Sequence, residues 1–232
     1  MNTLLVNGCS FGQCWSPSDS FLEKFGCTST VNLSKGGTSF QRTCRSTIEW
    51  IAQNHKPTMV AIPITFAHRW ELALNLHEDP IDGSWVPLQN SNFLSDRYTL
   101  QETSVESVKE LVEQYYKVIP TIKTHWDKIF TEIIMFAAFL EKQKIPYLMW
   151  DMCNGFDKEH IGGYAGFVKV DLIEQNPYII DLWQFCGNRF MRDTMTEDAK
   201  AKTPEFAHHH AKEQYYELEK YIIQYYVFCW KS

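Results

Sequence analysis

The chain opens with Thr3-Leu4-Leu5-Val6-Asn7-Gly8-Cys9-Ser10-Phe11-Gly12, a short apolar run that stops at a glycine and places a serine two positions later. Such a run, bounded by a turn residue, is typical of a strand buried in a parallel sheet. Glycine at the turn lets the backbone approach its neighbours closely and accepts positive φ. Open α/β sheets keep their sites at the carboxyl ends of the strands, so Ser10 is a candidate nucleophile. The alternative is an ordinary turn that contains a serine.

Later segments extend this pattern of strands and helices. Strands are predicted at residues 29–33, 58–65 and 145–150, with a short fifth strand within 178–185. Pro63 is expected near the end of its strand or at a bulge, because proline lacks a backbone donor. A loop with a short helix is predicted at residues 16–25, and helices at residues 41–55, 105–116, 124–142 and 211–230. The alternation predicts one domain, residues 1–232, of the α/β class: a three-layer α/β/α sandwich with a parallel sheet of about five strands in flavodoxin-like order.

Helical spacing also predicts which side chains face the core. The inward residues are expected to be Thr47, Ile48, Ile51 and Ala52 in the helix at 41–55; Ile129, Ile133, Phe136, Ala137 and Leu140 in the helix at 124–142; and Tyr215, Leu218, Ile222, Tyr225 and Tyr226 in the last helix.

Residues 72–104 interrupt the pattern, because no period persists through them. A stretch of this length without regular structure inside a compact domain is usually functional. We therefore expect a lid or a wall on the substrate side, with Trp85 and Phe93 covering a cleft. A surface excursion or a contact between copies of the chain explains the pattern equally well.

The composition excludes several classes of function. A net charge of -6 over 232 residues argues against a surface for nucleic acid or anionic membranes. No apolar run approaches the ~20 residues of a membrane span. The N-terminus lacks the basic and apolar regions of a signal peptide, so we expect a cytoplasmic protein. The seven cysteines are scattered without a CxxC pair, which indicates free thiols in a reducing compartment and no cysteine zinc site.

The parts needed for nucleophilic catalysis occur at the two ends of the chain. Ser10, Gly37 and Thr65 all follow predicted strands, so parallel pairing places them at one edge of the sheet. The stretch Glu205-Phe206-Ala207-His208-His209-His210 brings an acid and imidazoles just before the last helix. A hydroxyl can attack while an imidazole takes its proton, a carboxylate orients the imidazole, and backbone N–H groups hold the oxyanion.

Two other kinds of site compete for these residues. Three adjacent histidines suggest a metal, but on a helix neighbouring side chains point about 100° apart and cannot all ligate one ion. The turn Gly36-Gly37-Thr38-Ser39 has the composition of a phosphate cradle at a helix N-terminus, as in a flavin or nucleotide module, but it lacks a full fingerprint.

At these residues the chain resembles the SGNH or GDSL-type hydrolases, through four short blocks in the family's order. Gly8-Cys9-Ser10-Phe11 is similar to the Gly-Asp-Ser-Leu turn, in the Gly-Cys-Ser-Phe form of many phage and bacterial members. Residues 32–39 resemble the second block, with Gly37 as an oxyanion donor beside the N–H of Ser10. The third block departs from the family's Gly-x-Asn-Asp. Thr65, Arg69 and Glu71 instead match a Thr-x-x-x-Arg-x-Glu pattern, with the Thr65 hydroxyl as candidate third donor.

The fourth block of the family is Asp-x-x-His, and here Glu205 and His208 have that spacing. A different alignment places Thr203-Pro204 at the family's His-Pro, with His209 as the later histidine; it removes the base and predicts an inactive enzyme. Asp198 is a reserve for the acid. Arg69, Glu71 and His209 are expected behind the catalytic groups or on the substrate side, with Arg69 and Glu71 as an ion pair that fixes the third loop.

The resemblance implies a serine esterase or deacetylase that cleaves a small acyl ester or an acetylated carbohydrate through Ser10, His208 and Glu205. It implies no cofactor and no metal. The alternative is a catalytically inactive SGNH-like domain that binds a glycan or a protein partner, which the departures in the third and fourth blocks favour.

Overall fold

The computed structural model describes residues 2–65, 69–73, 85–88, 110, 114, 122–151, 171–173, 175–180 and 212–230. Its centre is a parallel 5-stranded sheet in the order β2-β1-β3-β6-β7. The order is that of flavodoxin-like doubly wound sheets. The predicted α/β class with a parallel sheet of about five strands is therefore confirmed. The strands are β1 (Thr3–Val6), β2 (Ser29–Asn32), β3 (Met59–Ile64), β6 (Tyr147–Asp151) and β7 (Ile179–Ile180).

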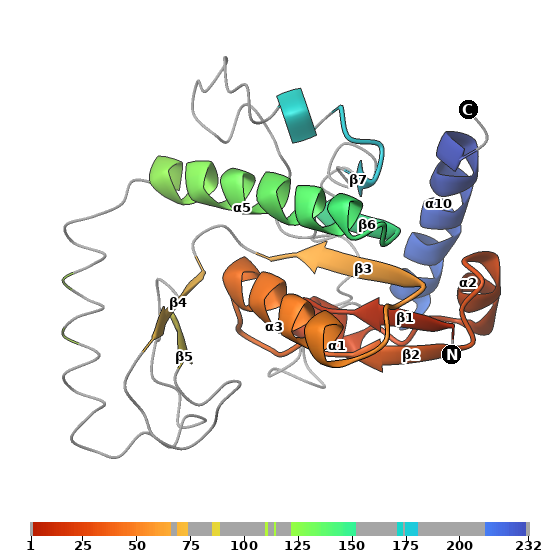
Figure 1. The fold of residues 1–232 in the computed structure, drawn as a ribbon, viewed down its shortest axis with the longest axis horizontal. Helices are drawn as coiled ribbons and strands as arrows, with labels where there is room; N and C mark the ends of the chain where they lie inside the picture. Colours follow the sequence, from red (N-terminus) through yellow and green to blue (C-terminus); the bar gives the residue numbers. More distant parts are fainter. Residues whose placement is uncertain are drawn as a thin grey trace, which may run out of the picture.

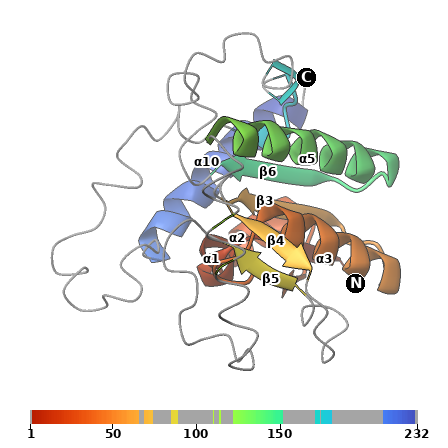
Figure 2. The same ribbon diagram turned by 90° about the vertical axis from the view of Figure 1, so that its left-hand side faces the viewer.

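Helices cover both faces of the sheet (Figures 1 and 2). On one face, α3 (Phe40–Gln53) and α5 (Ile122–Lys142) pack over Val60 and Ile62. On the other face, α2 (Asp19–Lys24) and α10 (Lys212–Trp230) pack over Leu4 and Ala61. Successive strand residues point to opposite faces, so both faces of a central strand must be apolar. This arrangement is consistent with a three-layer sandwich.

The apolar stripe of α5 is as predicted, and so is that of α10 for three of its five residues; the side chains of Tyr225 and Tyr226 lie outside the described part of the structure. All five predicted core residues of α5 are buried, and so are Tyr215, Leu218 and Ile222 of α10. In α3 the prediction is wrong for Ile48, which is 39% exposed, and for Ala52, which is also exposed. The buried residues of α3 are mostly polar: Thr47, as predicted, with Arg42, Thr43 and Ser46, beside the apolar Phe40. Periodicity of apolar residues cannot find a face that packs through hydrogen bonds.

The proline of the central strand β3 costs no hydrogen bond of the sheet. Val60 donates its N–H to the carbonyl of Pro146, just before β6. Backbone nitrogens along a strand point alternately to its two neighbours, so the nitrogen of Pro63, three residues later, points toward β1. The register of β1 with β3 ends at the pair of Val6 with Ala61. Pro63 therefore lies beyond the paired part of β1, near the end of its own strand, as expected.

Residues 72–104 were expected to lack regular structure, and this is wrong for the part that the structure describes. β4 (Trp70–Ala73) and β5 (Trp85–Leu88) pair antiparallel as a separate 2-stranded sheet. Both strands have only 4 residues, too few for an alternation to stand out, and Pro87 argues against a strand. Pro87 pairs with Glu71, whose N–H points away from β5 and donates to Gln41. The two residues therefore form a non-hydrogen-bonded pair, in which the missing N–H of proline costs nothing.

The C-terminal helix is fixed to the N-terminal part of the chain by a buried carboxylate. Glu219 of α10, 3% exposed, accepts hydrogen bonds from the Trp15 indole (2.9 Å) and from the backbone N–H of Ser18 (3.1 Å). The Ser18 hydroxyl also donates to Glu219, and it caps α2 by accepting from the N–H of Phe21. A buried carboxylate needs this set of donors, so the pairing specifies where α10 docks.

Two expectations from composition can be compared with the described residues. None of the described helices combines the length and the apolar character that a membrane crossing requires. Four cysteines, Cys9, Cys14, Cys27 and Cys44, are free thiols.

Candidate functional site

Ser10, Gly37 and Thr65 follow three adjacent parallel strands and leave the sheet at the same edge. Ser10 begins the short helix α1 (Ser10–Cys14), Gly37 lies between β2 and α3, and Thr65 comes directly after β3. In Figure 1 the arrowheads of β1, β2 and β3 point the same way, toward the side of the β4–β5 hairpin. The segments that carry these three predicted site residues are therefore brought together.

The loops after β1 and β2 stay paired beyond the strands. Leu33 donates its N–H to the carbonyl of Val6 (2.8 Å), and Lys35 donates to the carbonyl of Gly8 (3.0 Å). Because of this pairing, the turn that contains Gly36 and Gly37 lies next to Ser10. A Cβ placed on Gly36 would lie 3.8 Å from the Cβ of Ser10.

Gly8 is required by close approach rather than by its dihedral angles. A Cβ on Gly8 would lie 2.7 Å from Cγ and 2.9 Å from the carbonyl oxygen of Pro63. On Gly12 it would lie 2.5 Å from the hydroxyl oxygen of Ser34 and 3.0 Å from Pro63 Cγ. The turn that presents Ser10 is thus pressed against the end of β3, as the sequence predicted for a glycine at this position.

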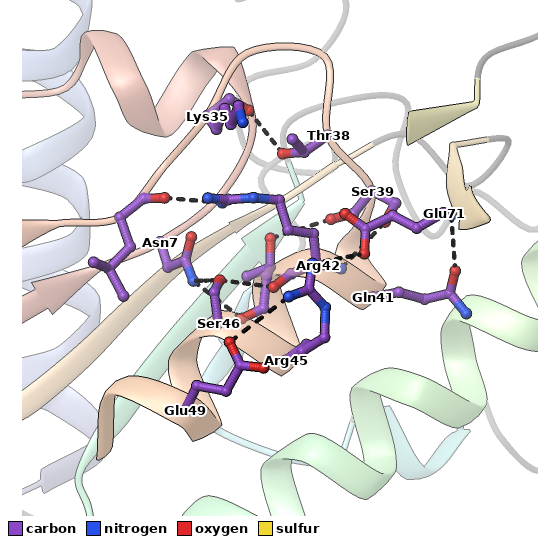
Figure 3. Close-up of polar contacts among 12 residues, drawn as sticks. Asn7, Lys35, Thr38, Ser39, Gln41, Arg42, Arg45, Ser46, Glu49 and Glu71 are labelled. Carbon is purple, nitrogen blue, oxygen red and sulfur yellow. Dashed lines mark hydrogen bonds and ion pairs between the residues drawn. The ribbon is translucent and has the colours of Figure 1, made fainter. Parts of the chain in front are cut away.

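The loop that carries Gly37 is held from several sides. Gly37 has φ of 76°, a conformation that favours glycine. The N–H of Gly36 donates to Oε1 of Gln13 on α1 (2.8 Å). The Thr38 hydroxyl donates to the carbonyl of Lys35 within the loop (2.7 Å) (Figure 3). The Thr65 hydroxyl donates to the carbonyl of Thr38 (3.3 Å).

Asn7, just before the Ser10 turn, fastens that turn to α3. Its side chain is fully buried, and its amide nitrogen points at Ser46 of α3 (Figure 3). The two amide hydrogens serve three acceptors, the hydroxyls of Ser46 and Thr47 (both 2.9 Å) and the carbonyl of Thr43 (3.0 Å). Its backbone N–H donates to Ala61 of β3 (3.1 Å). This buried amide accounts for the polar inward face of α3.

Thr65 and Arg69 form one hydrogen-bonded chain with the Gly37 loop. Nη1 of Arg69 donates to the Thr65 hydroxyl (3.2 Å), which in turn donates its proton to Thr38. A hydroxyl has one proton. Donation from Thr65 to an oxyanion would therefore require the hydroxyl to turn away from Thr38.

Glu71 connects the β4–β5 hairpin to α3. Its buried carboxylate forms an ion pair with Arg45 of α3 (3.3 Å), and its N–H donates to Oε1 of Gln41 (3.1 Å) (Figure 3). Glu132 of α5 belongs to the same cluster. Burial raises the pKa of Glu132 to about 7; Glu71 also raises it, while Lys128 and a hydrogen bond from Gln41 lower it.

The first turn of α10 lies beside α1. Burial raises the pKa of the Tyr215 phenol, and the nearby Cys14 and Cys9 raise it further. Burial also raises the pKa of the Cys14 thiol, with Cys9 contributing. Cys14, in the same helix as Ser10, therefore stays a thiol at neutral pH and is a weak nucleophile there.

Glu205, His208 and His209 lie outside the described residues, as do the reserve acid Asp198 and the predicted lid beyond the hairpin. Within the described segments, no group of three or more His, Cys, Asp or Glu side chains is arranged to hold a metal ion.

Sequence reasoning missed three side chains that shape this edge: Asn7, Gln13 and Arg45. Asn7 does carry a signal, because a polar residue that directly continues a buried apolar run must find partners. Gln13 and Arg45 carry none, since their partners, Gly36 and Glu71, lie 23 and 26 positions away in the sequence.

No protein-family model matches this sequence, and a search of curated proteins finds no significant similarity. The geometry of the sheet edge and the four sequence blocks are therefore the features that point to a function.

Proposed function

We propose that the chain is a serine hydrolase of the SGNH type, cleaving a small acyl ester or an acetylated carbohydrate, with Ser10 as nucleophile, His208 as base and Glu205 as orienting acid. One observation carries the proposal. Ser10 starts a helix at the carboxyl edge of the sheet, and the neighbouring glycine loop approaches it so closely that a Cβ on Gly36 would lie 3.8 Å from its own Cβ. A nucleophile beside a turn of backbone N–H groups is the arrangement that acyl transfer needs.

The reaction proceeds in two halves. Ser10 Oγ attacks the ester carbonyl and gives its proton to His208, and the oxyanion is held by the N–H groups of Ser10 and Gly37. The Ser10 N–H opens helix α1, where a helix offers no internal acceptor for it. The alcohol leaves with the proton from His208. A water molecule then gives a proton to His208 and attacks the acyl-serine, which releases the acid and restores Ser10.

The position of α10 supports the assignment of the base to the tail. Tyr215 lies near enough to Cys9 and Cys14 for both thiols to raise the pKa of its phenol. Cys9 directly precedes α1, and Cys14 is its last residue. His208 lies 7 residues before Tyr215 in the sequence. An extended chain spans up to ~3.5 Å per residue, or about 25 Å here, so His208 is within reach of the Ser10 edge.

The finer architecture belongs to the same proposal. We assign the sheet to the SGNH variant of the flavodoxin-like order, and we assign residues 72–104, which include β5, to the wall of the substrate site. The β4–β5 hairpin extends from the same edge of the sheet that carries Ser10, because β4 follows β3 and contacts α3 through Glu71.

A fluorophosphonate probe and an activated ester, p-nitrophenyl acetate, test the proposal. The chain should be labelled at Ser10 and hydrolyse the ester, and Ser10→Ala should abolish both. Ser16→Ala is the matched control, because Ser16 is exposed and lies just beyond α1. His208→Ala should lose activity while His209→Ala keeps it. Folded protein that is neither labelled nor active contradicts the proposal and supports an inactive domain that binds a glycan or a protein.

A further inference from the structure

Two side chains from different elements hold the residues on either side of Gly37. Gln13 of α1 accepts a hydrogen bond from the N–H of Gly36 (2.8 Å). Thr65, after β3, donates to the carbonyl of Thr38 (3.3 Å). We propose that Gln13 and Thr65 are positioning residues that bracket Gly37 and fix the orientation of its N–H for oxyanion binding. This inference rests on the proposed hydrolase function.

These two contacts are needed because the loop contains two adjacent glycines, which by themselves leave its backbone flexible. Glycine samples both signs of φ readily, and Gly37 must be held at 76°. An oxyanion donor contributes about 10²–10³ to the rate only when it is already aimed at the developing charge. Within the loop, the Thr38 hydroxyl donates to the carbonyl of Lys35, and Gln13 and Thr65 add contacts from outside it.

Gln13 links the loop to the helix of the nucleophile itself. It lies three residues after Ser10 in α1, so both side chains lie on the same side of the helix. A shift of α1 therefore moves Ser10 and the anchor of Gly36 together. The contact is tight, because a Cβ on Gly36 would lie 3.1 Å from Oε1 of Gln13.

Thr65 is suited to the opposite end of the bracket. The guanidinium of Arg69 donates to its hydroxyl oxygen (3.2 Å), which directs the single hydroxyl proton to the Thr38 carbonyl. Thr65 is 2% exposed, and in this role it acts through the loop instead of binding the oxyanion itself. The hole then consists of two backbone donors.

The test pairs each disruptive variant with a conservative one. Gln13→Met removes the acceptor at similar length, and Gln13→Glu keeps an oxygen acceptor. Thr65→Val removes the hydroxyl, and Thr65→Ser keeps it. Gln13 is exposed, so its variants are expected to fold even if Thr65→Val does not. Hydrogen exchange of the Gly36 and Gly37 amides, followed by NMR, reports the loop without reference to activity.

We expect Gln13→Met to speed exchange of the Gly36 amide at least tenfold, and Gln13→Glu to retain protection. With p-nitrophenyl acetate, Gln13→Met and Thr65→Val should lower kcat about tenfold with KM within twofold, and Thr65→Ser should restore kcat. Unchanged exchange in Gln13→Met overturns the bracket. Faster exchange with unchanged kcat overturns the positioning role. If the wild-type chain is neither labelled nor active, the proposed function fails, and the oxyanion role of Gly37 fails with it. Hydrogen exchange of the Gly36 and Gly37 amides still shows whether Gln13 and Thr65 hold the loop.

Discussion

Replacement of Glu132 by glutamine should stabilise the protein above neutral pH and have little effect in acid. Glu132 lies on α5, 3.9 Å from Lys128, in the cluster that contains Glu71 and Gln41. Burial raises its pKa from 4.5 to about 7, and glutamine imitates the protonated form. The side chain is only 22% exposed, so water does little to reduce the free-energy cost of ionising the buried carboxyl group.

The direction follows from proton binding in the folded and unfolded states. The folded chain keeps the Glu132 proton up to about pH 7, whereas the unfolded chain releases it near pH 4.5. Stability is therefore lost as pH rises through this window and stays constant above it. At about 1.4 kcal/mol for each pH unit, the cost above pH 7 is about 3 kcal/mol. The pKa of about 7 already includes the opposing attraction of Lys128, so Glu132→Gln should gain about 3 kcal/mol at pH 8.

Urea unfolding of both proteins at pH 5, 6, 7 and 8 measures this difference, provided that the m values agree. The gain should grow from less than about 1 kcal/mol at pH 5 to its full value at pH 8. Glu23→Gln, at an exposed site on α2, controls for the loss of one negative charge. A pH-independent difference, or a variant less stable than wild type at pH 8, would refute the reasoning.

Three further substitutions test how the sheet edge is built. Gly8→Ala places a Cβ within 2.9 Å of the Pro63 carbonyl, so it should cost about 1–3 kcal/mol in urea unfolding and shift the amide resonances of the Ser10 turn. Asn7→Ala removes the amide that bonds to α3 and should cost about 2–4 kcal/mol, seen as a lower thermal midpoint. Glu219→Ala leaves the buried Trp15 indole without its acceptor; it should cost about 2–4 kcal/mol and speed hydrogen exchange in α10.

The main elements of the fold could be predicted because each carries its own local signal. β1 and β3 are apolar runs between turn residues, and α5 shows an apolar stripe from Ile129 to Leu140 that the structure buries as a unit. Strand pairing follows from handedness and short connections once the elements are known. The edge that gathers Ser10, Gly37 and Thr65 follows from these two steps without any knowledge of side-chain contacts.

The features that could not be predicted depend on polar contacts between distant residues. The orientation of α3 is set by Asn7, which bonds to residues 36 to 40 positions away, and so Ile48 faces solvent although it is apolar. The β4–β5 hairpin has strands of 4 residues and is connected to α3 by Glu71 and Arg45. Neither contact has a periodicity that a sequence pattern could detect.

The geometry of Thr65 has a consequence for the range of substrates. In the SGNH-type hydrolases that the chain resembles, the third block supplies a side-chain donor to the oxyanion; here the Thr65 proton goes to Thr38, and Arg69 occupies the other side of the hydroxyl. Each missing donor typically costs about 10²–10³ in rate. Under the proposed hydrolase function, an oxyanion hole of two backbone donors should therefore favour esters whose alcohol is a good leaving group, because their transition states develop less charge on the carbonyl oxygen. The rate ratio of p-nitrophenyl acetate to ethyl acetate measures this preference, and a ratio near that of the uncatalysed reactions would argue against it.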